Sequence, residues 1–240
     1  VPYCPCPATA SNIAAALSWV DTGTVDPNIA IVPGLRNGFD DVMRGEETQV
    51  LGVLQNLQGE AGGDLLIGLP GSHSKWVEVA DGCIVHFDTF MTGEIFAVLS
   101  EHSILGRTQQ KGASFDGQAF DRGVQVALSA DGEIGPLSTV FSARSLGLTG
   151  DLSAIAQADY LSGLLIGHEL SALATTLRRR RNSVHLPSII LIGNGQLCAR
   201  YSRALDACGF ARVLLAEQAT ERGLWQLALA AGLITPNPSR

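Results

Sequence analysis

The chain has 240 residues, of which 46% are hydrophobic and only 16% are charged, and its mean hydropathy is +0.21. A formal net charge of −7 and a pI near 5.1 argue against nucleic acid or an anionic membrane as a partner. Every apolar run is broken before the ~18 residues that a membrane span needs. The opening VPYCPCPATA lacks the basic start and apolar core of a signal peptide, and five scattered cysteines fit a reducing cytoplasm. Cys4-Pro5-Cys6 has no second pair at zinc spacing, so no metal site is assigned.

The first half of the chain repeats one order of elements: an apolar strand, a glycine turn and a helix. The stretch IAIVPGL (29–35) reads as a strand before a turn, and GEETQVLGVLQNL (45–57) has the apolar spacing of a helix. A buried strand in DLLIGLPGSHSKWVEVA (64–80) stops at a Pro-Gly pair and alternates again after it. Asp81-Gly82 then predicts a tight reversal into a hairpin, which leads into a helix over 91–105.

The second half adds helices and two further strands. Residues 112–181 are predicted to be mostly helical, and the apolar stretch 160–177, YLSGLLIGHELSALATTL, is expected to be a buried helix. The segment SIILIGNGQLCARYSRALDACG (188–209) predicts a buried strand, a glycine turn and an amphipathic helix. A strand over 212–217 and a closing helix over 219–232 follow.

The near-continuous apolar strands indicate an α/β fold, because such strands are buried on both faces of a sheet. The hairpin adds antiparallel strands and makes the sheet mixed. Three strands in a meander, followed by strand-helix-strand-helix, resemble the core of one lobe of the ribonuclease-H-like, actin-like kinase fold. The basic run Arg178–Arg181 is expected to be a solvated helix end, where the helix dipole favours cations, although it could also bind an anion.

The turn after the buried strand of the hairpin is crowded with hydrogen-bond donors. Amides and hydroxyls of Gly71, Ser72, His73 and Ser74 could cradle a phosphate, with Lys75 as a point charge. An ordinary hairpin turn explains the same residues, since glycine and hydroxyl side chains are common in turns.

A second glycine turn follows the later buried strand. In IGNGQL, Gly193 and Gly195 would allow the close approach of a flat ligand or a phosphate, and Asn194 could donate to it. So short a Gly-x-Gly motif is also compatible with a simple helix N-cap.

Charged residues crowd two predicted helix starts. In VMRGEETQ, Glu46 or Glu47 could act as a general base or hold a magnesium-bound water, and Arg44 could clamp a substrate carboxylate. Carboxylates in a first turn are also favoured by the helix dipole alone, so a structural role is open. MTGE repeats the theme with Thr92 and Glu94, whereas the histidines show no ligand spacing.

Taken together, the motifs resemble the 2-dehydro-3-deoxygalactonokinase family. The resemblance rests on IVPGL, VMRGEETQVLG, LPGSHSKWV, FMTGEIFAVL, YLSGLLIGHE and LIGNGQLCARY, in that order, over nearly the whole chain. It implies a ribonuclease-H-like (actin-like ATPase) fold of two lobes with mixed central sheets, of which the first is incomplete here. Residues 1–60 would be the C-terminal part of the first lobe. Residues 61–240 would be the second, nucleotide-binding lobe, with a helical insertion at about 103–181.

The resemblance also implies an activity and assigns roles to the candidate residues. The family phosphorylates the 6-hydroxyl of 2-dehydro-3-deoxy-D-galactonate with ATP and Mg²⁺ in the cytoplasm. By motif, the turn Gly71–Lys75 would bind phosphates and Gly193–Gly195 adenosine. Glu47 or Glu46 would deprotonate the hydroxyl, and the sugar-acid side would be lined by Arg44, Thr92 and Glu94. No nucleic acid or membrane partner is implied, and a homodimer is left open.

One departure from the family pattern keeps two other functions open. The family's first phosphate motif is an aspartate-glycine hairpin, which would lie upstream of Val1. The aspartate that organises magnesium in the family is therefore expected to be missing from residues 1–240. A truncated, inactive remnant that binds nucleotide or sugar acid is therefore one alternative. An exopolyphosphatase-like hydrolase is another, although the net charge and sparse Lys and Arg count against a polyphosphate channel.

Overall fold

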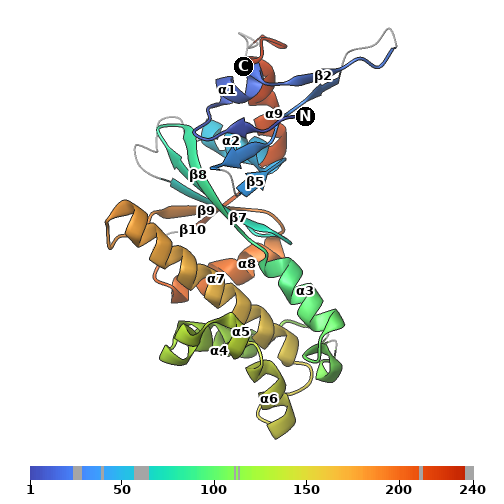
Figure 1. Ribbon diagram of the computed structural model, residues 1–240, viewed down its shortest axis with the longest axis vertical. Coiled ribbons are helices and arrows are strands. Elements are labelled where there is room, and N and C mark those ends of the chain that lie inside the picture. Colours follow the sequence, from blue (N-terminus) through green and yellow to red (C-terminus); the bar gives the residue numbers. More distant parts are fainter. Residues whose placement is uncertain are drawn as a thin grey trace.

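A computed structural model describes residues 1–23, 29–38, 41–56, 65–110, 112, 114–210 and 213–235. Its largest sheet has five strands in the order β10-β9-β6-β7-β8. These strands are β6 (Leu65–Leu69), β7 (Ser74–Ala80), β8 (Cys83–Phe90), β9 (Ser188–Ile192) and β10 (Val213–Ala216). Strands β6, β7 and β8 form an antiparallel meander, whereas β9 runs parallel to both β6 and β10. The predicted mixed sheet is thereby confirmed (Figure 1).

The hairpin between β7 and β8 turns where the sequence predicts it. Asp81 and Gly82 both have positive φ, 50° and 73°. Two consecutive left-handed residues are the mark of a type I′ turn, whose twist matches that of the two strands.

Side chains alternate between the two faces of this sheet, and different elements cover each face. On one face, Leu66, Trp76 and Leu191 belong to a core shared with helices α4 (Gly117–Leu128), α7 (Gln157–Arg181) and α8 (Gly195–Ala207). On the other face, Ile67, Val77 and Ile190 belong to a core shared with the N-terminal segment and the last helix. Period-two alternation of buried apolar residues is what places helices on both faces.

The second face is covered by helices and a small sheet. The helices are α1 (Ala10–Ala15), α2 (Glu46–Asn56) and α9 (Ala219–Ala230), and the sheet has the order β1-β4-β5. Its strands are β1 (Cys4–Pro5), β4 (Leu35–Asn37) and β5 (Asp41–Met43). Helix α9 packs against α2 and α1, so the end of the chain shares a core with its beginning (Figure 1). The expected boundary between residues 60 and 61 lies outside the described residues.

The predicted strand over 29–35 is wrong in one respect. The structure has two short strands there: β3 (Ile29–Ile31), which pairs with β2 (Ser18–Val20), and β4, which belongs to a different sheet. Pro33 and Gly34 separate them, because proline cannot continue a strand ladder and glycine weakens one.

Helices fill the chain between β8 and β9, as the sequence predicts. They are α3 (Thr92–His102), η1 (Gly106–Thr108), α4, η2 (Ala130–Ile134), α5 (Pro136–Thr139), α6 (Ser142–Thr149) and α7. Helix α7 contains the predicted buried stretch and crosses the sheet face (Figure 1). Among the described residues, no helix is both long and apolar enough to cross a bilayer.

Candidate functional site

The structure brings the two predicted glycine turns together. Strands β6 and β9 are parallel neighbours, with Gly68 opposite Leu191, so their carboxyl ends meet at the same edge of the sheet. A Cβ atom on Gly193 would lie 3.4 Å from the carbonyl oxygen of Pro70, and Gly193 has φ of 146°. The turns are thus in contact although they are far apart in the sequence. Ligands of α/β sheets bind at this edge.

The five predicted phosphate-binding residues divide into two groups. Gly71 is half-buried, and Ser72 and His73 are exposed, so their amides and side chains can reach a ligand. Ser74 and Lys75 are 1% and 5% exposed and already belong to strand β7. Because neighbouring residues of a strand point to opposite faces, these two side chains leave the turn in opposite directions.

Helix α3 supports the exposed turn from behind. The Glu94 N–H donates to the Ser72 carbonyl at 3.0 Å, and His73 Nε2 lies 2.5 Å from Glu94 Oε2. A Cβ atom on Gly93 would lie only 2.3 Å from the carbonyl oxygen of Gly71, so the close approach requires glycine. Glu94, which the resemblance places on the sugar-acid side, therefore lies directly against the turn Gly71–His73.

A buried polar network lies beneath the same turn. The Trp76 indole N–H donates to Glu169 Oε1 at 2.7 Å, and the Tyr201 hydroxyl donates to Glu169 Oε2 at 2.8 Å. Tyr201 is also 2.8 Å from Ser74 Oγ, and Thr92 joins the network from the first turn of α3. Burial raises the pKa of Glu169 to about 6, although these bonds oppose the rise. Sequence reasoning missed Glu169 and Tyr201; the available signal was a single glutamate inside the apolar stretch 160–177.

The second turn begins helix α8 with a side-chain cap. Asn194 Oδ1 accepts hydrogen bonds from the N–H groups of Gln196 and Leu197, at 3.0 and 3.3 Å. This is the N-cap geometry that the sequence offered as the alternative. The Asn194 side chain thus occupies two of the first amides of α8 and fixes the start of the helix.

Two cavities flank the start of α8. One of about 260 Å³ is lined by Gly71, Ser72, Thr92 and Tyr201, among others, and so opens beside the first turn. The other, of about 770 Å³, is lined by residues of α8 and of the helical layer, including Phe115, Asp159, Gln196, Arg200 and Arg203. In it, the Arg200 guanidinium stacks 4.5 Å from the centre of the Phe115 ring and lies 3.0 Å from Asp159.

The start of α2 buries one of the two candidate glutamates. Glu47 is 1% exposed, and its Oε2 accepts from the Gly45 N–H at 2.7 Å. Burial raises the pKa of Glu47, the hydrogen bonds of Gly45 and Thr48 oppose the rise, and the charge of Glu46 adds to it. Glu46 is less buried and accepts from the Arg44 N–H at 2.9 Å. Both carboxylates thus accept hydrogen bonds from the amides that immediately precede α2, and the buried one gains proton affinity.

Lys75 and Arg44 lie on the face of the sheet that α2 covers. Lys75 Nζ donates to the Val42 carbonyl at 2.6 Å and to Thr89 Oγ1 at 2.5 Å, so it joins β7 to the segment that enters α2. The Arg44 guanidinium donates to the Val1 carbonyl at 2.8 Å and stacks 4.5 Å from the Tyr3 ring centre. The Lys75 ammonium is therefore engaged away from the turn.

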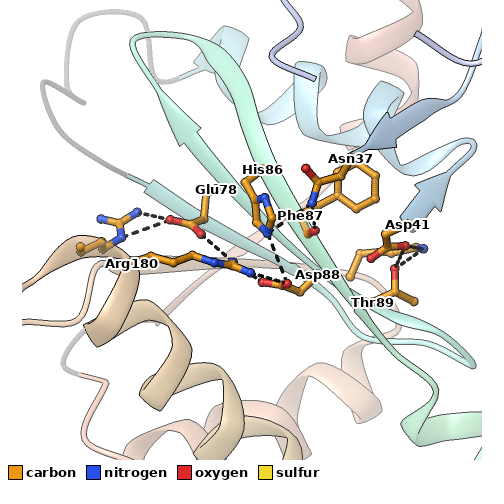
Figure 2. Close-up of polar contacts among 10 residues, drawn as sticks. Asn37, Asp41, Glu78, His86, Phe87, Asp88, Thr89 and Arg180 are labelled. Atoms are coloured by element: carbon orange, nitrogen blue, oxygen red, sulfur yellow. Dashed lines mark hydrogen bonds and ion pairs between the residues drawn. The ribbon is translucent and has the colours of Figure 1, made fainter. Parts of the chain in front are cut away.

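The expectation of a solvated helix end holds for Arg178 and Arg179, which are exposed, and is wrong for Arg180 and Arg181, which form ion pairs. Arg180 donates to Asp88 at 2.5 and 2.8 Å and to Glu78 at 3.1 Å, and Arg181 reaches Glu78 at 3.3 Å (Figure 2). Asp88 and Glu78 stand on neighbouring strands at the edge of the sheet, so these pairs tie the helix end to β7 and β8.

His86 lies against the same carboxylates. Its Nε2 is 3.3 Å from Asp88 Oδ1 and 3.2 Å from Asn37 Nδ2 (Figure 2). Glu78, His86 and Asp88 are the one group among the described residues with the spacing of a metal site. Arginine already neutralises both carboxylates, so we assign the cluster a structural role.

Two glycine turns in contact at the carboxyl edge of a mixed α/β sheet, beside cavities of about 260 and 770 Å³, are an arrangement typical of α/β proteins that bind phosphate-containing ligands. The family model described as 2-keto-3-deoxy-galactonokinase matches residues 1–227. The chain belongs to this family of sugar-acid kinases.

Relatives of known name agree with the family. The probable 2-dehydro-3-deoxygalactonokinase of Rhizobium meliloti (strain 1021) is 36% identical over 235 residues, which are 95% of this chain and 72% of that protein. The 2-dehydro-3-deoxygalactonokinase of Escherichia coli (strain K12) is 35% identical over 214 residues, 87% of this chain and 65% of that one. A crystal structure assigned as a 2-dehydro-3-deoxygalactonokinase from Sinorhizobium meliloti superposes with a TM-score of 0.81 at 34% identity, covering 95% and 74% of the two chains.

Proposed function

We propose that this chain catalyses transfer of a phosphoryl group from ATP to the 6-hydroxyl of 2-dehydro-3-deoxy-D-galactonate. The observation that carries the proposal is the contact between the turns at Gly71–His73 and Gly193–Gly195, at the carboxyl ends of two parallel strands. The named relatives, which this chain spans over 72% and 65% of their lengths, supply the substrate.

We further propose that the fold is ribonuclease-H-like, of the actin-like ATPase type. Its support is the sheet order, in which the first strand of a three-stranded meander pairs with a later parallel strand at the centre. In this proposal, residues 1–60 belong to the first lobe. Residues 61–240 form the nucleotide-binding lobe, with its helical insertion at about 103–181.

In the proposed complex, ATP spans the two turns. Its adenosine lies over Gly193–Gly195, with the adenine base in the cavity beside Gln196 and Arg200. Its terminal phosphates meet the amides of Gly71–His73. Mg²⁺ would arrive with the phosphates and neutralise part of their charge. Glu94, half-exposed against the turn, is proposed to contact the sugar acid.

The proposed chemistry needs one proton acceptor. The substrate oxygen attacks the γ-phosphorus, the bond to the β-phosphate oxygen breaks, and the hydroxyl proton passes to the Glu47 carboxylate as ADP leaves. Burial, which raises the proton affinity of Glu47, supports it over Glu46 in this role. Arg44 and Thr92 would contact the sugar acid.

A coupled assay of ADP release, with and without the sugar acid, tests the proposal. Turnover that requires the sugar acid supports the kinase. Phosphate release without sugar would indicate the exopolyphosphatase-like hydrolase, and nucleotide binding without turnover would indicate the remnant. We also propose that the protein is cytoplasmic and forms a homodimer. The exposed apolar side chains of Ile95 and Val98 on α3 support the dimer, and light scattering on the purified protein would test it.

A further inference from the structure

We propose that Glu169 is a positioning residue for phosphoryl transfer, which through Tyr201 and Trp76 holds the strand that carries the turn Gly71–His73. The proposal rests on the function proposed above for that turn. It assigns a kinetic role to a side chain that is 3% exposed and acts through its hydrogen bonds.

The geometry places Glu169 at the junction of four elements. It lies on α7, and its two carboxylate oxygens receive one bond from β7, through Trp76, and one from α8, through Tyr201. Thr92 brings the first turn of α3 to the same carboxylate. Strand β7 follows the turn Gly71–His73, α8 begins at the turn Gly193–Gly195, and α3 packs against the turn Gly71–His73.

The direction of the hydrogen bonds follows from the charge. An ionised Glu169 only accepts, so the Tyr201 hydroxyl must donate to it, and Ser74 Oγ must then donate to Tyr201. Ser74 immediately follows His73 in the chain. One buried carboxylate therefore orders a chain of bonds that ends at the residue beside the exposed turn.

The network fixes the turn where its own side chains do not. Ser72 and His73 are exposed, and both form hydrogen bonds with Glu94 in the first turn of α3. Beneath them, Ser74 and Trp76 are 1% exposed and bonded into the network. A displacement of about 1 Å at a phosphate-binding amide is enough to lower a phosphoryl-transfer rate by about 100-fold.

Two substitutions test this role and one serves as a matched control. Glu169→Gln keeps the shape but makes the side chain a donor toward Tyr201, and Tyr201→Phe removes the bond to Ser74. Tyr160→Phe removes a tyrosine-serine hydrogen bond, 2.7 Å to Ser142, from a tyrosine as buried as Tyr201 that lies in the helical layer away from the turn. All three are compared with the full wild-type chain for kcat, KM for ATP, melting temperature and amide hydrogen exchange.

We expect kcat to fall about 10- to 100-fold in Glu169→Gln and Tyr201→Phe, with KM for ATP within about threefold of wild type. Amides over 71–76 should exchange about tenfold faster in both, whereas Tyr160→Phe should change neither measurement. Unchanged kcat and unchanged exchange over 71–76, in variants that melt like wild type, would overturn the proposal. A variant that fails to fold leaves the other to decide.

The exchange measurement separates this proposal from the proposed function. If wild type shows no sugar-dependent ADP release, the function fails, and exchange over 71–76 still decides whether Glu169 holds the turn. If wild type is active and only the exchange changes, the kinetic role is wrong although the physical link is real.

Discussion

Buried charges of opposite sign lie at the two faces of strand β7: Lys75, which belongs to the strand, and Glu169, which belongs to α7 and bonds to Trp76. On the face toward β5, Lys75 has a carboxylate partner, with Asp41 Oδ1 at 3.7 Å from its ammonium. On the face toward α7, Glu169 is held by neutral donors, and no cation among the described residues forms an ion pair with it. The difference teaches that one charge is compensated by pairing, whereas the other retains a desolvation cost that raises its pKa.

The largest effect should come from the face that α2 covers, where the chemistry is proposed. Glu47→Gln should lower kcat by about 1,000-fold, because the proton acceptor is lost while the bond from the Gly45 N–H can be kept. Its neighbour provides the control: Glu46→Gln should lower kcat less than about tenfold. Steady-state ADP release with saturating sugar acid measures both. A greater loss in Glu46→Gln would transfer the role of base to Glu46.

The next effect tests the paired charge. Lys75→Met keeps the apolar stem but removes the donors to Val42 and Thr89 and leaves Asp41 without its cation. We expect a loss of about 3 kcal/mol in the free energy of unfolding, measured by urea denaturation. Because the loss is mainly the unpaired carboxylate, Lys75→Met with Asp41→Asn should cost less than the single change. A double variant that is no more stable than the single one would show that Lys75 acts through its backbone bond alone.

The sequence predicts the turns and the sheet because both are local signals. Glycines 71, 193 and 195 stop apolar strands, and parallel strands bring such turns to one edge. The predicted hairpin also implies that Ser74 and Lys75 point to opposite faces of the sheet, because side chains alternate along a strand and both residues lie in it.

The supporting residues could not be predicted with the same method. Glu169 and Tyr201 are joined to Ser74 and Trp76 across three separate elements, and nothing local in the sequence specifies those partners. The basic run was misjudged for a related reason. Its partners, Asp88 and Glu78, stand on β8 and β7, whose distance from the end of α7 depends on how the helix crosses the sheet.

A smaller effect tests the unpaired charge through pH. The pKa of Glu169 is raised to about 6 in the folded protein, from an ordinary value of 4.5. Its contribution to stability is thus complete below pH 4.5 and is lost as pH rises through 6. Relative to Glu169→Gln, wild type should gain about 2 kcal/mol in unfolding free energy between pH 7 and 4.5.

The comparison with Glu169→Gln is needed because other groups near α7 titrate as well. Burial lowers the pKa of His168, the next residue, so acid works against the folded state there. Trp76, Thr92 and Ser74 face Glu169 without titrating, and the pKa of Tyr201 is raised well beyond this range by burial and by the Glu169 charge. A pH-independent difference between wild type and variant would show that the carboxylate is solvated.

The smallest effect comes from the far end of α7, where charges are paired and partly exposed. Arg180 has 34% of its side chain exposed, so Arg180→Met should cost about 1 kcal/mol, and less at high salt. Arg179→Met, an exposed neighbour on the same turn, is the control and should be neutral.

The sign of the pH dependence separates the middle of α7, at Glu169, from its C-terminal end. Burial works to raise the pKa of Asp88, but the bonds and charge of Arg180, with His86, outweigh it and lower the pKa. The stabilisation is therefore present above about pH 3.8 and is lost in stronger acid, opposite to Glu169. Urea titrations at pH 3 and pH 6 should show the difference between wild type and Arg180→Met shrinking in acid. If that difference instead grew in acid, the ion pair with Asp88 would not be what stabilises the helix end. The contrast between the paired charge of Asp88 and the unpaired charge of Glu169 would then be wrong.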